Sequence, residues 1–249
     1  MLGRRHDAST ALAALDVANR LFERVSCDMI YARPGQTAAA WREELSALLD
    51  RAGRHLSLYQ LTIEPGTPFA ALHAAGRLAT PDGDVSAELY EATADVTAAR
   101  GLAPYEISNY AVPGSECRHN LVYWRGGDWL GVGPGAHGRL TVAGERFATS
   151  TERHPERWLA AVETRGHGLV DDEVLGDGEI ADELLVMGLR LDEGLDVDRL
   201  ERLSGRRLDR GAIADLEASG FLEWTGGGRL RVRPSGRLVL DAILRTLSG

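Results

Sequence analysis

The chain has 249 residues, of which 44% are hydrophobic and 26% are charged, which is typical of a soluble globular protein with one large domain or two smaller ones. Its formal net charge of -9 disfavours nonspecific binding to nucleic acid or to anionic lipid. It has no apolar run long enough to span a bilayer, and no apolar stretch of a secretory signal follows Arg4 and Arg5. We therefore expect a cytoplasmic protein without a transmembrane segment.

The first 110 residues alternate between helical and strand patterns. Apolar residues at helical spacing predict a helix from about Asp7 to Phe22, and the run Val25–Tyr31 predicts a strand that ends at the turn Arg33–Gly35. Thr37 can cap a second helix. The buried stripe of that helix would contain Trp41, Leu45, Leu48 and Leu49.

A second strand is predicted at His55–Leu61, a helix at Asp84–Arg100 and a short strand at Pro104–Ser108. This order of elements predicts parallel strands joined by crossover helices. Because these units are too few to close a barrel, we interpret residues 1–110 as part of one.

Residues 111–178 break the pattern. They are rich in Gly, His, Trp and Tyr as far as about residue 150, and turn residues interrupt them too often for long elements. We interpret them as a motif-rich loop followed by a connecting region. Loops of this composition often carry functional side chains.

Residues 179–249 predict a small winged-helix-like α+β domain. Three helices are followed by a hairpin whose strands contain Phe221–Trp224 and Arg229–Arg233, and a last helix runs from Pro234 to Leu247. The apolar residues expected to face the core of this domain are Ile180, Leu184, Met187, Leu191, Val197, Leu200, Leu203, Ile213, Leu216, Leu238, Ile243 and Leu247.

The sharpest local motif is Cys117–Trp124. Histidine is a common ligand of haem iron, and aromatic side chains can stack on a porphyrin plane. Arg118 and Arg125 could pair with porphyrin propionates. The alternative is that His119 and Asn120 are turn residues and that Tyr123 and Trp124 belong to the core.

Three further features each have a structural alternative. The loop Gly131–Gly138 superficially resembles a phosphate-binding loop, but Pro134 removes an amide donor and a tightly packed turn also explains it. Asp28 lies inside an apolar strand, where a carboxylate binds a ligand or pairs with an arginine. The wing arginines, Arg229, Arg231 and Arg233, could contact DNA, but a solvated strand face on an acidic protein is the favoured explanation.

Five segments in order resemble one family along essentially the whole chain. They are Asp28–Thr37, Ser57–Thr67, Tyr105–Ala111, His119–Trp124 and Gly131–His137. The family is that of the oxygen-independent coproporphyrinogen III oxidases and their relatives, and the His-Asn-x-x-Tyr-Trp element is similar to its haem-chaperone branch, HemW. The resemblance implies the C-terminal part of a radical S-adenosylmethionine (radical SAM) partial (β/α)6 barrel, followed by the small C-terminal domain.

The resemblance also implies cofactor sites. Asp28 and Ile30, and with them the backbone near Thr62, would line the S-adenosylmethionine pocket. The haem element would consist of His119, Asn120, Tyr123 and Trp124, with His119 as the ligand of the haem iron. No residue is assigned a catalytic role, and whether the chain is an enzyme stays open.

The chain also departs from the family pattern. The Cys-x-x-x-Cys-x-x-Cys motif that binds the 4Fe-4S cluster is absent, and the two cysteines, Cys27 and Cys117, are too few to replace it. Ala32 and Arg33 stand where the family has Gly-Leu. We therefore expect an N-terminally truncated chain without a cluster of its own, whose first strand has an unpaired edge that invites self-association.

The resulting hypothesis is a haem-chaperone-like radical SAM protein that binds haem or porphyrin and delivers it to haem-accepting proteins. The alternative within the family is a fragment of a coproporphyrinogen III oxidase. A third hypothesis, from another class, is a winged-helix protein that binds nucleic acid, and the net charge argues against it.

Overall fold

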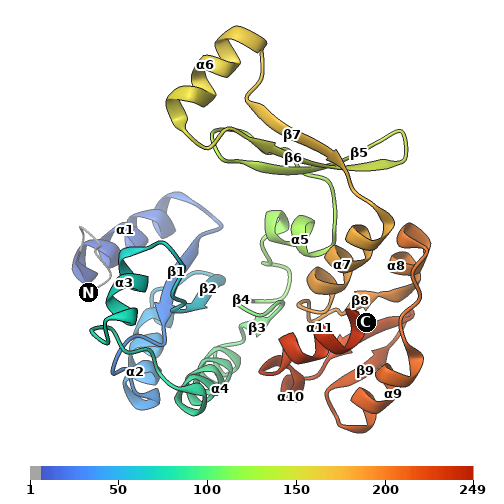
Figure 1. Cartoon of the computed structure of the whole chain (residues 1–249). Helices are drawn as coiled ribbons and strands as arrows, with labels where there is room; N and C mark the ends of the chain where they lie inside the picture. The colour runs from blue at the N-terminus through green and yellow to red at the C-terminus, as the bar shows by residue number, and fades with distance from the viewer. Residues whose placement is uncertain (1–6, 249) are drawn as a thin grey trace. The chain divides into compact units, whose positions relative to one another are not determined.

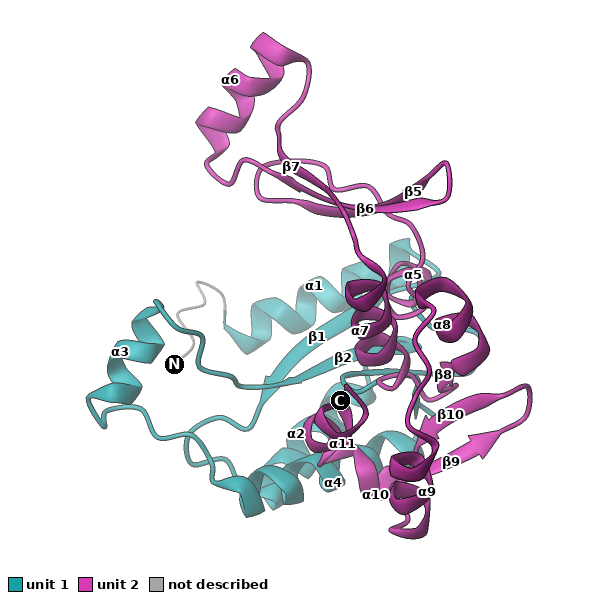
Figure 2. Ribbon diagram, turned by 45° about the vertical axis from the view of Figure 1, so that its right-hand side comes forward, with its two compact units in different colours: residues 1–117 teal, residues 118–249 magenta. Residues whose placement is uncertain are grey.

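The computed structural model describes residues 7–248 and divides the chain into two compact units, residues 1–117 and 118–249 (Figure 2). Residues 1–6, which include Arg4 and Arg5 of the predicted non-secretory start, lie outside the described residues. The three-part division predicted at residues 110 and 178 differs from this one and stays a prediction. No helix within residues 7–248 is both long and apolar enough to cross a membrane.

Unit 1 contains a four-stranded sheet with helices around it (Figure 1). Its elements are α1 (Ala8–Leu21), β1 (Ser26–Tyr31), α2 (Ala38–Leu49), β2 (His55–Gln60), α3 (Pro68–Ala74), α4 (Gly83–Ala99), β3 (Ala103–Pro104) and β4 (Asn109–Ala111). β1 and β2 pair in parallel, as predicted, and β1 lies at an edge of the sheet. Self-association through that edge stays a prediction.

The core of unit 1 lies between one face of the sheet and the helices α2 and α4. All four residues of the predicted stripe on α2 are buried, and Thr37 caps that helix by accepting a hydrogen bond from the amide of Ala40. Trp41 is fully buried and stacks on Tyr31 with ring centroids 5.1 Å apart. Its indole nitrogen donates to the hydroxyl of Thr93 at 2.8 Å, which satisfies the one polar atom of the ring.

The prediction of a strand at Pro104–Ser108 is wrong. The chain makes only a two-residue strand, β3, then turns and forms β4, which runs antiparallel to β2 with Ser57 opposite Asn109. Glu106 explains the turn, because its Oε1 accepts hydrogen bonds from the Ser108 amide at 2.7 Å and from the Asn109 side chain at 2.5 Å. The sheet order is therefore β1-β2-β4-β3, and the sheet is mixed rather than parallel throughout.

Unit 2 begins with the segment that the sequence predicted as loop and connection. It contains α5 (Arg118–Trp124), a sheet of β5 (His137–Val142), β6 (Glu145–Thr151) and β7 (Leu169–Val174), and the helix α6 (Pro155–Arg165) between the last two strands. Up to about residue 150 these elements have at most seven residues, and the longer helix α6 lies in the predicted connecting region. The hairpin turn is Ala143–Gly144, with φ of 53° and 89°, and alanine at a left-handed position gives a weak turn signal.

The C-terminal part of unit 2 confirms the predicted helices and hairpin. Its elements are α7 (Asp177–Gly188), β8 (Leu195–Asp196), α8 (Val197–Ser204), α9 (Arg210–Ala218), β9 (Leu222–Thr225), β10 (Arg229–Val232), α10 (Pro234–Arg237) and α11 (Leu240–Ser248). β8 adds a third strand to the hairpin, in the order β8-β10-β9.

Two of the core residues predicted for this domain are exposed. Leu203 and Leu238 expose about half of their surface, at 50% and 48%. The last helix is interrupted between α10 and α11, where the amide of Val239 bonds to the carbonyl of Gly236 in a tighter turn. This interruption shifts the helical phase, and Leu240 is buried in place of Leu238.

Candidate functional site

One face of the sheet in unit 1 is polar. Side chains alternate along β1 and β2, so that the face opposite the core carries Ser26, Asp28 and Ile30 next to His55 and Ser57. We call these five residues the polar sheet face. Asp28 is exposed, and the strand register places it opposite Ser57. The predicted contact of Asp28 with a neighbouring arginine is not formed among residues 7–248, which leaves its carboxylate available to a ligand.

His55 lies at the centre of a hydrogen-bonded chain on this face. Its Nδ1 lies 2.8 Å from the hydroxyl of Ser26 and its Nε2 2.7 Å from the hydroxyl of Tyr105. Burial lowers the pKa of the His55 imidazole, and the nearby carboxylate of Asp28 opposes this effect. A neutral imidazole can make both hydrogen bonds, because it donates through one nitrogen and accepts through the other.

A second series of hydrogen bonds begins at Ser57. Its hydroxyl donates to Asn109 Oδ1 at 2.8 Å, and Asn109 donates in turn to Glu106 Oε1. Glu106 is fully buried, and its other oxygen, Oε2, has no hydrogen-bond partner among the described residues. The polar sheet face is thus backed by buried, oriented polar groups.

The predicted S-adenosylmethionine residues are only partly brought together. Asp28 and Ile30 share the polar sheet face, two positions apart on β1. Thr62 lies just beyond β2, where its hydroxyl donates to Glu64 Oε1 at 3.3 Å. Arg33, which stands where the family has Leu, pairs with Glu44 of α2. The carboxylate of Glu44 therefore balances the positive charge of Arg33.

The two cysteines do not form a ligand set for an iron–sulfur cluster. Cys27 packs against the core of unit 1, and burial, with a further contribution from Asp28, raises the pKa of its thiol. A thiol with a raised pKa is a poor thiolate ligand. Residues 7–248 contain no group of three or more His, Cys, Asp or Glu side chains that could hold a metal ion. A 4Fe-4S cluster therefore does not fit the described residues.

In unit 2 the motif residues lie on α5, a helix with no buried residue. The alternative that His119 and Asn120 are turn residues and that Tyr123 and Trp124 are core is therefore wrong. His119 is exposed, while Asn120, Tyr123 and Trp124 are half-buried.

His119 and Tyr123 are four residues apart and lie on the same side of α5. The Tyr123 hydroxyl lies 2.8 Å from His119 Nε2, and the two rings meet edge to face with centroids 4.6 Å apart. Tyr123 also meets Trp129 edge to face at 4.7 Å.

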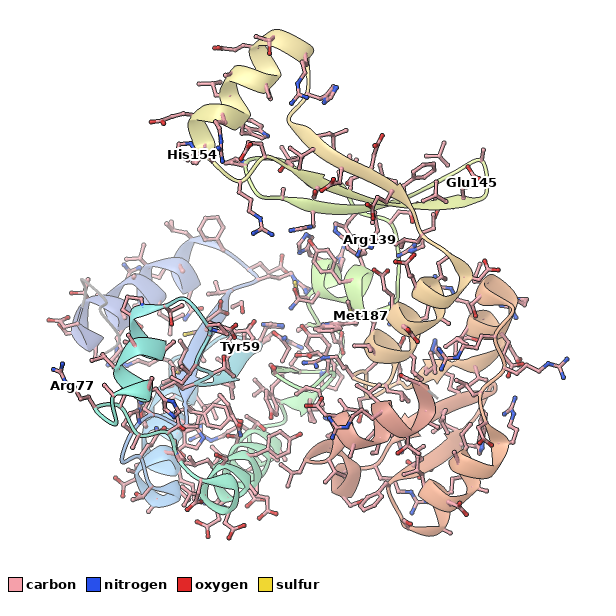
Figure 3. All side chains as sticks on the ribbon, viewed as in Figure 1. Tyr59, Arg77, Arg139, Glu145, His154 and Met187 are labelled. Atoms are coloured by element: carbon pink, nitrogen blue, oxygen red, sulfur yellow. The ribbon has the colours of Figure 1, made fainter. Side chains whose placement is uncertain are left out.

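Trp129 fixes this aromatic group to the sheet. Its backbone pairs with Arg139 of β5, at 2.7 and 2.9 Å, and its indole nitrogen donates to the carbonyl of His137. The guanidinium of Arg139, a residue labelled in Figure 3, lies 5.7 Å from the Trp129 ring and donates twice to Glu183 of α7. The residues His119, Tyr123 and Trp129 form a cluster that we call the α5 aromatic cluster.

Trp124 lies beside a cavity rather than in this cluster. The guanidinium of Arg190 lies 4.8 Å from its ring, and the cavity, of about 250 Å³, is lined by Trp124, Arg125, Leu184, Glu193, Arg199 and Arg229 among others. Arg125 donates to both oxygens of Glu193, at 2.9 and 2.6 Å, and lowers the pKa of that carboxyl. Arg125, predicted as a partner of propionate, is therefore already bound to a carboxylate.

The remaining two features have structural explanations. A Cβ on Gly131 would lie 2.6 Å from the His137 carbonyl oxygen, which identifies the Gly131–Gly138 loop as the tightly packed turn. The three wing arginines each form an ion pair: Arg229 with Glu193, Arg231 with Glu223 and Asp192, and Arg233 with Glu223. Each wing arginine thus has a carboxylate partner, as expected for a solvated strand face.

Sequence reasoning missed several residues that shape these sites. His55, Ser57, Tyr105, Glu106 and Asn109 form the polar chains, yet only the alternation of polar residues in the His55–Leu61 strand hinted at a polar face. The spacing of His119 and Tyr123 could have predicted their contact once α5 was recognised as a helix. The roles of Trp129 and Arg190 depend on contacts between distant segments, and no local signal indicates them.

Similar proteins are found for nearly the whole chain. Residues 177–239 match the HemN C-terminal domain. The chain is 38% identical to the mitochondrial radical S-adenosyl methionine domain-containing protein 1 of Mus musculus, over 99% of this chain and 58% of that protein. It is 36% identical to the heme chaperone HemW of Mycobacterium tuberculosis, over 96% of this chain and 59% of that protein.

A solved structure has the same fold. The coproporphyrinogen III oxidase HemN of Escherichia coli, described as a radical SAM enzyme, superposes with a TM-score of 0.75 and 18% identity, over 99% of this chain and 60% of that one. The chain thus spans somewhat less than two thirds of the length of the proteins it matches.

Proposed function

Since this chain belongs to the radical SAM family of HemN and HemW, we propose that it binds haem through the α5 aromatic cluster and serves as a haem chaperone. The observation that carries the proposal is the exposed imidazole of His119 on a short helix, flanked by Tyr123 and backed by Trp129. An imidazole supplies a nitrogen ligand to iron, and the aromatic rings supply an apolar surface for the edge of a porphyrin.

The relatives support the haem side of the family. Proteins named heme chaperone HemW match 80% or more of this chain at 31–36% identity. The porphyrin would be cargo, held at an accessible site and released to an acceptor protein. An exposed ligand on a helix without buried residues suits reversible binding better than an enclosed pocket would.

The polar sheet face is the proposed site of S-adenosylmethionine. Asp28 offers a free carboxylate to a ligand hydroxyl or ammonium, and Ile30 offers an apolar contact on the same face. Bound adenosylmethionine would supply its sulfonium chemistry only with a cluster that these residues do not provide. The contribution of this chain is to bind and orient the ligand, with Ser57 and His55 holding the backing hydrogen bonds.

A haem titration tests the proposal, with the Soret band as the measurement. His119→Ala should weaken haem affinity at least tenfold and shift the band, because the nitrogen ligand is lost. His73→Ala is the matched control, since His73 is also an exposed histidine on a seven-residue helix, α3. Equal losses in the two variants, or none in either, would show that haem adsorbs without using this site.

A further inference from the structure

The hydrogen bond between Tyr123 and His119 sets the state of the imidazole. The Tyr123 hydroxyl and His119 Nε2 are 2.8 Å apart. A phenol is a much stronger acid than the N–H of a neutral imidazole, so the favoured arrangement has the hydroxyl donating and Nε2 accepting. The ring hydrogen of a neutral His119 then lies on Nδ1.

In this state neither nitrogen of His119 offers a free lone pair. The lone pair of Nε2 accepts the hydrogen bond, and Nδ1 carries the hydrogen. An imidazole binds a metal only through an unprotonated nitrogen. His119 is therefore exposed to solvent and yet blocked as a ligand.

The position of Tyr123 is fixed from behind. Its ring packs edge to face on Trp129, which is tied to β5 by two backbone hydrogen bonds and by one from its indole nitrogen to His137. The Tyr123 hydroxyl is thus held at a fixed position relative to α5. Its hydrogen bond to His119 spans a single helical turn. Opening requires only rotation of the His119 side chain, which is exposed.

We propose that Tyr123 is a latch on His119: its hydroxyl occupies Nε2 in the free protein, and binding of an iron porphyrin requires this hydrogen bond to break. The inference rests on the proposed function and adds its regulation. The latch lowers the affinity of His119 for haem, which keeps the cargo releasable.

This role and a simple orienting role predict opposite signs. If Tyr123 only holds His119 in a productive position, Tyr123→Phe should weaken haem binding. If Tyr123 is a latch, the same variant frees Nε2 while keeping the ring contacts with His119 and Trp129, and haem should bind more tightly. Loss of one such hydrogen bond corresponds to roughly a two- to tenfold gain in affinity.

Acylation of His119 by diethyl pyrocarbonate tests the latch without haem. This reagent reacts with a free imidazole lone pair, and the modified residue is identified by mass spectrometry of peptides. At mildly alkaline pH we expect His119 to react roughly two- to tenfold faster in Tyr123→Phe than in the unmodified sequence. His73 should react at the same rate in both proteins and serves as the internal reference.

A second variant controls for loss of a phenol elsewhere. Tyr90→Phe removes a hydroxyl from a half-buried tyrosine on α4, and it should change neither the acylation rate of His119 nor haem affinity. Circular dichroism confirms that the variants are folded. Equal or slower acylation of His119 in Tyr123→Phe, or weaker haem binding, overturns the latch. If neither the unsubstituted chain nor either variant binds haem, the proposed function fails. The acylation rates then still decide whether the latch exists.

Discussion

The sheet of β1, β2, β4 and β3 and the sheet of β5, β6 and β7 differ in what covers them. In the first, Leu56 and Leu58 are fully or almost fully buried under α2 and α4. In the second, Gly138 and Thr151 are the only buried residues among the described strand positions. The strands of both sheets are paired along most of their length, with one register shift between Ser150 and Thr151 in the second sheet. Strand pairing alone therefore does not require an apolar face, and only the first sheet leaves a strong mark on the sequence.

The largest effect should come from the core of the first sheet. Trp41→Ala removes a fully buried ring that stacks on Tyr31, and it leaves the Thr93 hydroxyl without its donor. We expect the free energy of unfolding of unit 1 to fall by about 3–5 kcal/mol. Urea denaturation combined with segment-resolved hydrogen exchange measures the loss.

The matched change in the second sheet is Val142→Ala at the end of β5, where the side chain is 57% exposed. It should alter stability by about 0.5 kcal/mol or less. A loss as large as that of Trp41→Ala would mean that the second sheet has a hidden apolar core, and the comparison between the sheets would fail.

An intermediate effect should arise where the second sheet is closely packed. A Cβ on Gly138 would lie 2.5 Å from the Thr149 hydroxyl and 3.0 Å from the Gly131 amide nitrogen. Gly138→Ala should therefore destabilise the hairpin of β5 and β6 by about 1–3 kcal/mol, through overpacking. Hydrogen exchange of the β5 and β6 amides reports this local change.

Gly178→Ala is the control for Gly138→Ala. A Cβ at Gly178, in the first turn of α7, meets nothing within 4 Å. This variant should be neutral or slightly stabilising, because alanine favours helix. If both variants behave alike, close packing at Gly138 does not hold the second sheet together.

A small effect of opposite sign, a gain in stability, should arise at the end of β1. Ala32 is buried and has φ of 56°, a left-handed conformation that costs a residue other than glycine about 1–2 kcal/mol. Ala32→Gly relieves this strain but loses about 0.5–1 kcal/mol to the greater freedom of the unfolded chain. A net stabilisation of about 0.5 kcal/mol should appear in thermal melts.

Ala39→Gly provides a contrast of opposite sign. Ala39 is exposed on α2, and glycine there should cost about 1 kcal/mol because it weakens the helix. A loss of stability in Ala32→Gly of the same size would show that the left-handed conformation at Ala32 is not strained.

The difference between the sheets also explains what the sequence could predict. The stripe Trp41, Leu45, Leu48 and Leu49 repeats at helical spacing because every member is buried, and all four predictions are confirmed. The turn at Glu106 and the reversal into β4 were missed, since they depend on a side chain that bonds to residues two and three positions later. The strands β5 to β7 were missed because their exposure does not alternate.

The sites follow the same rule. Asp28 and Ile30 were assigned to one pocket by the family resemblance, and alternation along β1 places them on the same face of the sheet. That His119 and Tyr123 touch, and that Trp129 stands behind them, depends on α5 being a helix and on β5 returning to it. Whether these residues bind adenosylmethionine and haem stays a prediction for the experiments above.

Arg24 holds the last turn of unit 1 in place. Its guanidinium donates to the carbonyl oxygens of Gly114, Ser115 and Glu116, at 3.5, 3.2 and 3.0 Å, and α5 begins at Arg118. The chain between this clamp and the helix is the single residue Cys117. One side chain thus serves three consecutive carbonyl groups, and Arg24→Ala would leave all three of these acceptors to water.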